Sequence, residues 1–409
     1  MKKIGLYGIA GVYNLGCEAI VRGIYTLYKD KVNDAEWIYF SPNAIEDKQR
    51  LSDLSIEVRQ IKRKCVFIKR CLNKMFDILH MDKQIPLDDY KEIINEADTI
   101  ISIGGDIYTI PKYLRENDKY PYHNRLVEFG EMALARNKKL IIYGASIGPF
   151  GEYDKAVNYY IEHLKKVDLI CVREDDTKEY LNKLGIANNV MFIPDPAFYL
   201  RGMCERKKKC NRIGINLSGL SLLETYGDVS DLAINKLVEV IIKIIEKTEC
   251  EIEFFPHVFS RYEVDNDLIL LKRIKDNIPG RYKKYIMISN ARDFLTVKRE
   301  LTECSIVIAA RMHCAINALS EGIPTILLSY SSKAKGICKF VYESEQWVYD
   351  IKKINEEAFV SLVYEMLENR SQIEEEIKNR LDQKLDMNLY KNVINRMVDI
   401  VNLSGRDVL

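Results

Sequence analysis

The chain has 409 residues, a formal net charge of +1 and 47% apolar residues. At about 150 residues per domain, this length predicts two or three domains with sizeable cores. The near-zero charge excludes a generally basic nucleic-acid binder, which needs an excess of Lys and Arg on one face, and the apolar residues along the whole chain exclude extended disorder.

The N-terminal segment begins with two lysines and an apolar stretch, which is the start of a signal-peptide pattern. Glycines at positions 5, 8, 11 and 16 interrupt that stretch, so we predict a strand, a glycine-rich loop and then a helix. No apolar stretch in the chain reaches the roughly 18 residues that a membrane-spanning helix needs.

The loop GIAGVYNLGCEAI has neither the dinucleotide-binding nor the P-loop glycine spacing. A Gly/Asn loop that opens a helix can still bind an anion or a sugar hydroxyl through free backbone N–H groups. Asn14, Gly16 and Glu18 are therefore candidate substrate-binding residues. The alternative for Glu18 is that its carboxylate only complements the helix dipole.

Ten cysteines are scattered along the chain without a C-x-x-C pair or a paired Cys/His pattern. We therefore expect no zinc site, no metal of any kind, and a reducing, cytoplasmic environment.

The segment 61–80, IKRKCVFIKRCLNKMFDILH, alternates Lys and Arg with large apolar residues. This composition is typical of a basic amphipathic helix that rests on anionic lipid, and it predicts peripheral contact with the inner face of a membrane. The alternative is a solvated helix packed on its domain.

Further along the first half, short apolar runs alternate with helical segments, which predicts a parallel sheet covered on both faces. One run ends in Gly104, Gly105 and Asp106, and another ends immediately before Arg173. Glycine at a strand end lets the backbone approach a ligand, so Gly104 and Gly105 are candidate substrate-binding residues, and Asp106 is a candidate acceptor-binding group or base. A strand-end Arg is suited to bind phosphate or carboxylate, although a salt bridge to Glu174 or Asp175 is the alternative for Arg173.

The strand–helix pattern restarts at RIGINLSG, after the basic stretch 204–212. We predict an α/β protein of the GT-B-like class: an N-terminal Rossmann-like acceptor-side domain over 1–203, a C-terminal Rossmann-like donor-side domain over 211–355, and a helical tail over 356–409. The active site is expected in a cleft between the two domains, beyond the carboxyl ends of the strands.

The most informative stretch is CSIVIAARMHCAINALSEGIPTILLSY, in which a buried strand runs straight into Arg311, Met312 and His313. Arg and His two residues apart at a strand-to-helix junction can direct an anion clamp and a proton donor into the same space. The helix N-terminus adds a positive dipole there. Lys333, in the following Ser/Gly loop, is a further candidate for binding acidic groups.

Together these segments resemble the polysaccharide pyruvyl transferase family over most of the chain. The matching pieces are YNLGCEAI, IGGD, YGASIGPF, VRED, PDPAF, IGINLS and above all VIAARMHCAINALSEGIPTILLSYSSK. The sequence departs from the family pattern where Tyr13 and Cys17 replace a Gly and an Asp, and where GGD replaces GGG.

The resemblance implies a GT-B-like transferase that moves a pyruvyl group from phosphoenolpyruvate to a sugar of a bacterial surface glycan or its lipid-linked precursor, forming a ketal without a cofactor. It further implies that His313 is the general acid, and that Arg311 and Arg173, with Lys333 as a weaker candidate, hold the donor's phosphate and carboxylate. Two alternatives stay open: a GT-B glycosyltransferase that uses a nucleotide sugar, and a non-catalytic glycan-assembly protein.

Overall fold

The computed structural model describes residues 1–32, 34–79, 81, 84–204, 211–227, 229–329, 333–353 and 355–403. It divides into two compact units: unit 1 comprises 1–12, 20–196 and 387–409, and unit 2 comprises 13–19 and 197–386. Each unit contains one sheet, and every pair of neighbouring strands in both sheets is parallel.

The sheet of unit 1 has seven strands in the order β3-β2-β1-β4-β5-β6-β7. Their bounds are β1 Lys2–Tyr7, β2 Ala35–Ser41, β3 Ile56–Gln60, β4 Thr99–Ile103, β5 Lys139–Tyr143, β6 Leu169–Val172 and β7 Val190–Phe192. Every residue of β4, β5 and β6 is buried, as expected for central strands of a parallel sheet with both faces covered.

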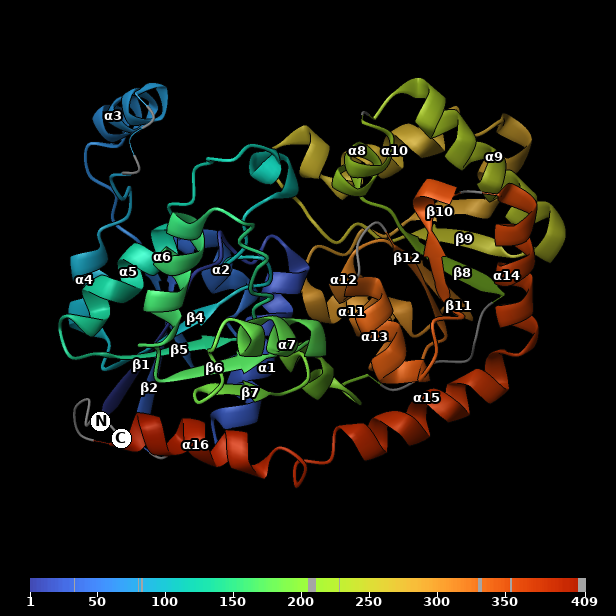
Figure 1. The fold of residues 1–409 in the computed structure, drawn as a ribbon. Helices are drawn as coiled ribbons and strands as arrows, with labels where there is room; N and C mark the ends of the chain where they lie inside the picture. The colour runs from blue at the N-terminus through green and yellow to red at the C-terminus, as the bar shows by residue number, and fades with distance from the viewer. Residues whose placement is uncertain are drawn as a thin grey trace. The chain divides into compact units, whose positions relative to one another are not determined.

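The helices of unit 1 are α2 Ala44–Arg50, α3 Val66–Ile78, α4 Tyr90–Glu96, α5 Arg125–Leu134, α6 Asp154–Leu164, α7 Asp175–Lys183 and α16 Lys391–Asn402, with a short 3-10 helix at Lys112–Glu116. Helices α4, α5 and α6 lie side by side over the sheet, whereas α3 stands away from this layer (Figure 1). Helix α1, Leu15–Tyr28, begins in unit 2 and continues in unit 1.

The sheet of unit 2 has six strands in the order β10-β9-β8-β11-β12-β13. Their bounds are β8 Arg212–Asn216, β9 Glu251–Phe254, β10 Ile286–Ile288, β11 Ile306–Ala309, β12 Thr325–Ser329 and β13 Val348–Asp350. In both sheets the strand order reverses beside the first strand, between β1 and β4 and between β8 and β11. This reversal is the topological switch point where open α/β sheets bind ligands.

Two helical layers cover the sheet of unit 2 (Figure 1). One contains α9 Asp231–Thr248, α10 Asp267–Asn277 and α14 Glu356–Glu368, and the other contains α11 Phe294–Leu301, α12 Met312–Leu319 and α13 Lys333–Tyr342. The remaining helices are α8 Gly219–Tyr226 and α15 Arg370–Lys384, with 3-10 helices at Pro196–Leu200, Glu263–Asp265, Gly280–Tyr285 and Ile351–Lys353.

The predicted architecture of parallel sheets with flanking helices and a helical C-terminal tail is confirmed. The division into units differs from the predicted domain bounds. Residues 13–19 belong to unit 2 because Leu15 N donates to His257 O (3.0 Å) and Phe259 N donates to Tyr13 O (3.2 Å).

The tail is divided as well. Helices α14 and α15 belong to unit 2, and α16 belongs to unit 1, where it packs near β1 and Lys2 Nζ donates to Asn402 O (2.8 Å). Part of the predicted boundary stretch, 205–210, lies outside the described residues. Within the described ranges, no helix combines the length and the apolar character needed to cross a bilayer.

Candidate functional site

The residues predicted to carry chemistry fall into two clusters. Gly104, Gly105, Asp106 and Arg173 lie in unit 1, and Asn14, Gly16, Glu18, Arg311, His313 and Lys333 lie in unit 2. Each cluster is described by its own contacts.

In unit 2, the switch point between β8 and β11 is organised by Asn216, a buried residue at the end of β8. Its Oδ1 accepts a hydrogen bond from Arg311 N (2.9 Å), and its backbone carbonyl accepts one from Ala310 N (3.0 Å). The Asn216 amide Nδ2 donates to Phe255 O (2.9 Å). Asn216 thus fixes the turn from β11 into α12, the helix that begins directly after Arg311.

The Arg311 guanidinium is held by two carboxylates. Its Nε and Nη2 donate to Asp267 Oδ1 (3.2 and 2.8 Å), and Nη2 also donates to Asp265 Oδ1 (3.0 Å). Burial by itself lowers the pKa of Arg311, but Asp267 and Asp265 outweigh it and raise that pKa, so the guanidinium stays charged. Its Nη1 makes no hydrogen bond to the described part of the chain, which leaves one edge for a ligand.

Asp267 is fully buried and couples Arg311 to the loop after β9. Its Oδ2 accepts hydrogen bonds from His257 N (3.0 Å) and Val258 N (3.1 Å). Burial raises the pKa of Asp267, and Arg311 and these hydrogen bonds oppose part of the rise. A carboxylate bonded on both oxygens orients its partners rather than reacting, so Asp267 is a positioning residue.

His313 lies in the first turn of α12, and its imidazole packs against Gly16. A Cβ added to Gly16 would lie 2.6 Å from His313 Nδ1 and 2.8 Å from its Cγ, distances that real side chains do not tolerate. Gly16 has no left-handed backbone conformation, so it is needed here for space and not for its φ. The glycine of the first loop and the histidine of the second half therefore form one contact.

His257, in the loop after β9, is a second imidazole in this cluster. It is 1% exposed, and neither ring nitrogen has a hydrogen-bond partner among the described residues. Burial, followed by the charges of His313 and Arg311, lowers its pKa to about 3, so it is neutral at pH 7. An unsatisfied buried polar group costs about 1–3 kcal/mol, and in native proteins such groups are accounted for by an ordered water, a bound ion or ligand, strain or a catalytic role.

Two predicted loop residues have structural partners. Asn14 is the N-terminal cap of α1: its Oδ1 accepts from Gly16 N (2.9 Å) and its carbonyl accepts from Cys17 N (2.9 Å). Glu18 is fully buried, and its Oε2 accepts from Phe294 N (3.2 Å) at the start of α11. Its carboxylate therefore stabilises the N-terminus of another helix.

Lys333, predicted to lie in a Ser/Gly loop, instead begins α13. Residues 330–332 of that predicted loop lie outside the described residues. Lys333 lines a small cavity of about 30 Å³ together with Met312 and Ala315 of α12. The structure therefore places Lys333 in the neighbourhood of the Arg311–His313 turn.

In unit 1, Arg173 is buried and surrounded by acceptors. Its Nη1 donates to Asp195 Oδ2 (2.7 Å), Nη2 donates to Ser146 Oγ (3.3 Å), and Nε lies 3.5 Å from Glu174 Oε1. Burial lowers the pKa of Arg173, and Asp195, Glu174 and Asp106 raise it by more. The salt bridge to Glu174 expected as the alternative is present, together with a shorter one to Asp195.

The glycine turn after β4 packs against this arginine. A Cβ at Gly105 would lie 3.2 Å from Arg173 Nη2, and a Cβ at Gly104, whose φ is +144°, would clash with Ile107 at 2.8 Å. Asp106, the next residue, is exposed and close enough to act on the pKa of Arg173. Glycine is thus required at Gly104 by its φ and by this contact, whereas a Cβ at Gly105 would need the Arg173 guanidinium to move by a few tenths of an ångström.

Sequence reasoning missed Asn216, His257, Asp267 and Asp195. Asn216 and His257 follow the apolar runs RIGI and EIEFF, so the strand-end rule applied to Arg173 and Arg311 would have found both. Asp195 follows the apolar run VMFI and meets the same rule, whereas Asp267 carries no such pattern, because its role depends on an arginine 44 residues away.

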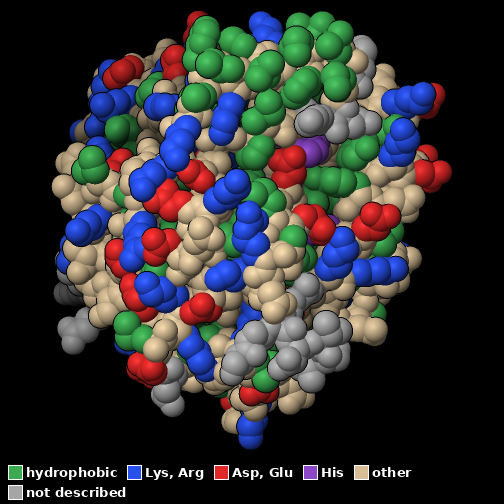
Figure 2. Space-filling view, turned by 90° about the vertical axis from the view of Figure 1, so that its left-hand side faces the viewer, with side chains coloured by type: hydrophobic (Ala, Val, Ile, Leu, Met, Phe, Trp, Pro, Cys, Tyr) green, Lys and Arg blue, Asp and Glu red, His purple; other side chains and the backbone are tan. Residues whose placement is uncertain are grey.

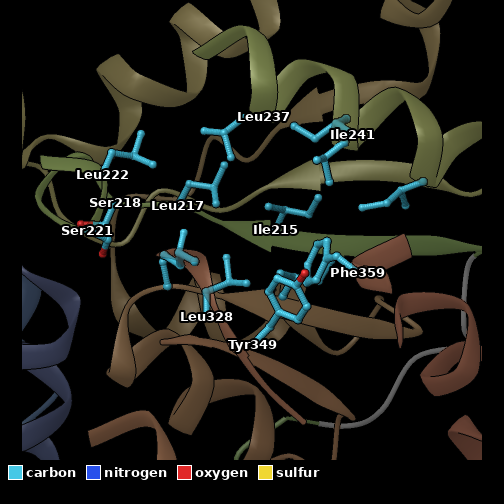
Figure 3. Close-up of a pocket in the computed structure, with 15 residues that line it drawn as sticks. Ile215, Leu217, Ser218, Ser221, Leu222, Leu237, Ile241, Leu328, Tyr349 and Phe359 are labelled. Carbon is cyan, nitrogen blue, oxygen red and sulfur yellow. The ribbon is translucent and has the colours of Figure 1, made fainter. Parts of the chain in front are cut away.

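An apolar pocket lies between the sheet of unit 2 and helices α8 and α9 (Figure 3). Leu237 and Ile241 line one side, Tyr349 and Phe359 another, and Ser218 lies at its far end. Its volume is about 40 Å³, room for a few water-sized atoms, whereas ligand pockets measure about 300–1,000 Å³. This pocket is a packing gap of the core. Among the described residues, no three His, Cys, Asp or Glu side chains are placed to hold a metal ion.

Comparison with known proteins adds three findings. The family model described as "Polysaccharide pyruvyl transferase" matches residues 14–332. The amylovoran biosynthesis protein AmsJ of Erwinia amylovora is 21% identical over 422 residues, covering 93% of this chain and 96% of AmsJ.

Among solved structures, the chain is similar to S. aureus MnaA bound to UDP, with a TM-score of 0.60, 12% identity and full coverage of both chains. It is also similar to Anabaena Alr3699/HepE in complex with UDP and glucose, with a TM-score of 0.59, 11% identity, and coverage of 98% of this chain and 99% of that one. At such low identity, these two structures establish the fold alone.

Proposed function

The chain belongs to the polysaccharide pyruvyl transferase family, and on that premise we propose that it transfers a pyruvyl group from phosphoenolpyruvate to two hydroxyls of one sugar in a surface glycan or its precursor, forming a cyclic ketal. The similarity to AmsJ, a protein named for the biosynthesis of a polysaccharide, agrees with this substrate class.

The observation that carries the proposal is the turn from β11 into α12. It combines a guanidinium held in place by Asp267, the N-terminus of an eight-residue helix, and an imidazole in that helix's first turn. A compact anion with an adjacent carbon to protonate matches these three features. The Arg311 guanidinium binds the anion, the positive end of the α12 helix dipole stabilises it, and the His313 imidazole delivers a proton.

In the proposed reaction, His313 protonates C3, the methylene carbon of the enol, and positive character develops at C2. One sugar hydroxyl attacks C2, and attack by the second hydroxyl then breaks the bond between C2 and the phosphate oxygen. Of the two hydroxyl protons released, one balances the proton given to C3 and the other leaves with inorganic phosphate. General acid catalysis of this kind typically contributes about 10²–10⁴-fold.

The remaining chain residues bind and orient the substrates in this proposal. Arg311, through its open Nη1 edge, holds the donor's phosphate or carboxylate, with Lys333 of the same unit as a further donor-binding residue. Neutral His257 offers a hydrogen bond to the donor. Gly104, Gly105 and Asp106 of unit 1 are assigned to the acceptor. No cofactor is needed, because phosphoenolpyruvate carries both the pyruvyl group and its leaving group.

Ligand-dependent thermal unfolding tests the donor. A ligand that binds only the folded chain at about 100 times its Kd stabilises it by about 2.7 kcal/mol. We expect phosphoenolpyruvate to raise the Tm and UDP- or GDP-sugars to leave it unchanged. A rise with nucleotide sugars alone would replace this proposal with a nucleotide-sugar glycosyltransferase.

The proton-transfer step has its own test. In D₂O, protonation at C3 places one deuterium in the ketal methyl group, which mass spectrometry of the product detects as an added mass of about one dalton. His313→Gln should bind phosphoenolpyruvate and lose transfer by about 10²-fold or more. Retained transfer in His313→Gln contradicts the acid role of this residue.

A further inference from the structure

Helix α3 presents an apolar strip to solvent. Phe67, Ile68, Met75, Ile78 and Leu79 are all exposed, with exposed fractions of 79% for Phe67 and 68% for Ile78. At 100° per residue these positions, with the exposed Cys71, occupy one continuous face of about 120°. Figure 2 shows a gathering of apolar side chains at the top of the molecule, on the side of unit 1 where α3 stands.

The opposite face attaches the helix to its own unit. Asn73 Nδ2 donates to Ile85 O (3.0 Å), Asn73 Oδ1 accepts from Ile85 N (2.7 Å), and Lys69 Nζ donates to Pro86 O (2.8 Å). Leu72 and Phe76, on the same side, are partly buried. These contacts hold the opposite face of α3 against the loop that follows the helix, and the strip is left facing solvent.

This arrangement is the reverse of an ordinary surface helix, which turns its apolar face to the core and its charged face to water. A contiguous exposed apolar face marks a binding surface. The charges around the strip identify what it binds. The segment 61–79 carries six Lys or Arg and one carboxylate. This excess of positive charge matches an anionic surface.

The cations differ in their availability. Lys62, Arg63 and Lys64, before the helix, pair with Glu92, Asp88 and Asp89. Arg70 and Lys74 lie along one flank of the strip, and neither pairs with an acid in the described part of the chain. An apolar strip edged by positive charge is the pattern of a helix that lies in a lipid interface.

We propose that α3 docks unit 1 onto an anionic lipid bilayer, with the strip buried at the boundary between headgroups and acyl chains and with Arg70 and Lys74 beside the phosphates. A second copy of the chain fits this face less well, because pairing two strips would bring the flanking cations of both copies around one small apolar contact. The inference does not depend on the reaction proposed above.

The test is co-sedimentation of the full chain with vesicles of phosphatidylcholine, with and without phosphatidylglycerol. We expect binding only to the anionic vesicles, weakening as salt is added. Because a surface cation contributes about 1 kcal/mol, Arg70→Gln combined with Lys74→Gln should lower the partition coefficient about thirty-fold. Phe67→Ser combined with Ile78→Ser should lower it at least tenfold.

Control variants remove cations or a large apolar side chain at exposed helical positions of unit 2. Lys272→Gln combined with Lys378→Gln removes two cations, and Leu232→Ser removes one apolar side chain. We expect the controls to bind like the unaltered chain. Since all these positions are exposed, the Tm of every variant should stay unchanged.

A second measurement reports the depth of insertion. The native Trp37 and Trp347 are buried and insensitive to lipid, so Phe67→Trp introduces a tryptophan that responds. Its emission should shift to the blue with anionic vesicles only. The proposal is overturned if the chain does not bind vesicles, or if the control variants lose binding as much as the α3 variants do. It is also overturned if the chain does not bind vesicles but self-associates, and Phe67→Ser abolishes that self-association.

Discussion

Gly16→Ala is the most discriminating single substitution in the unit 2 cluster. The new methyl group would lie 2.6 Å from His313 Nδ1, where ordinary van der Waals contact begins near 3.4 Å. The imidazole must therefore retreat by about 0.8 Å, or the start of α1 must shift by a similar amount. Since Gly16 lies in the first turn of a helix, the backbone itself accepts alanine.

Local propensity and site geometry predict opposite effects. Alanine in place of glycine stabilises a helix by about 0.5–1 kcal/mol, so a loss of function cannot come from a weakened helix. A displacement near 1 Å of a catalytic group costs about 10²-fold in rate. We expect transfer from phosphoenolpyruvate, followed as inorganic phosphate release with acceptor present, to fall by about that factor while the chain stays folded.

Gly336→Ala is the matched control, because Gly336 also lies in a helix, α13, and an added Cβ there meets no atom of the described residues within 4 Å. It should leave transfer unchanged. NMR locates the effect: the chemical shifts of the His313 ring protons should change in Gly16→Ala and not in Gly336→Ala. The chain has only five histidines to assign. Full activity with an unmoved His313 ring in Gly16→Ala would refute the reasoning.

Three further predictions concern buried groups. His257 has a folded-state pKa of about 3, so the unfolded chain binds a proton below its ordinary pKa of about 6.5 while the folded chain does not. The free energy of unfolding should thus fall by about 2 kcal/mol from pH 7 to pH 5 through this group, and urea titrations of His257→Phe should lack that component. Asp267→Ala leaves the partly exposed Arg311 charge with Asp265 as a carboxylate partner and should lower the free energy of unfolding by less than the roughly 3–5 kcal/mol of a fully buried pair, at about 1–3 kcal/mol. The double substitution with Arg311→Met should recover much of this loss, and equal losses in the single and double variants contradict the coupling. Asp195→Ala should cost a similar amount through Arg173, and a Tm equal to that of the unaltered chain would show that the Arg173 charge is satisfied without Asp195.

The sequence alone predicts the parts of this protein that depend on local pattern. Continuous apolar runs such as IISI and LIIY are buried on both sides, which only a covered parallel sheet provides, and helical spacing between them predicts the layers. The same logic predicts Arg311 and His313 as site residues, because strand ends in such sheets meet at one edge. The mixture of cations and large apolar residues over 61–80 likewise predicts a basic helix, which forms as α3.

Only the tertiary structure decides the partners of these groups. No pattern in the first loop predicts that Gly16 makes room for His313, since 297 positions separate them along the chain. The pairing of Arg311 with Asp267 and of Arg173 with Asp195, and the burial of Glu18 under α11, likewise depend on which loops the sheets bring together. Sequence periodicity determines which face of an element is buried. The electrostatic energy of a charged group or an imidazole depends instead on the atoms within a few ångströms of it, and those atoms come from distant parts of the chain.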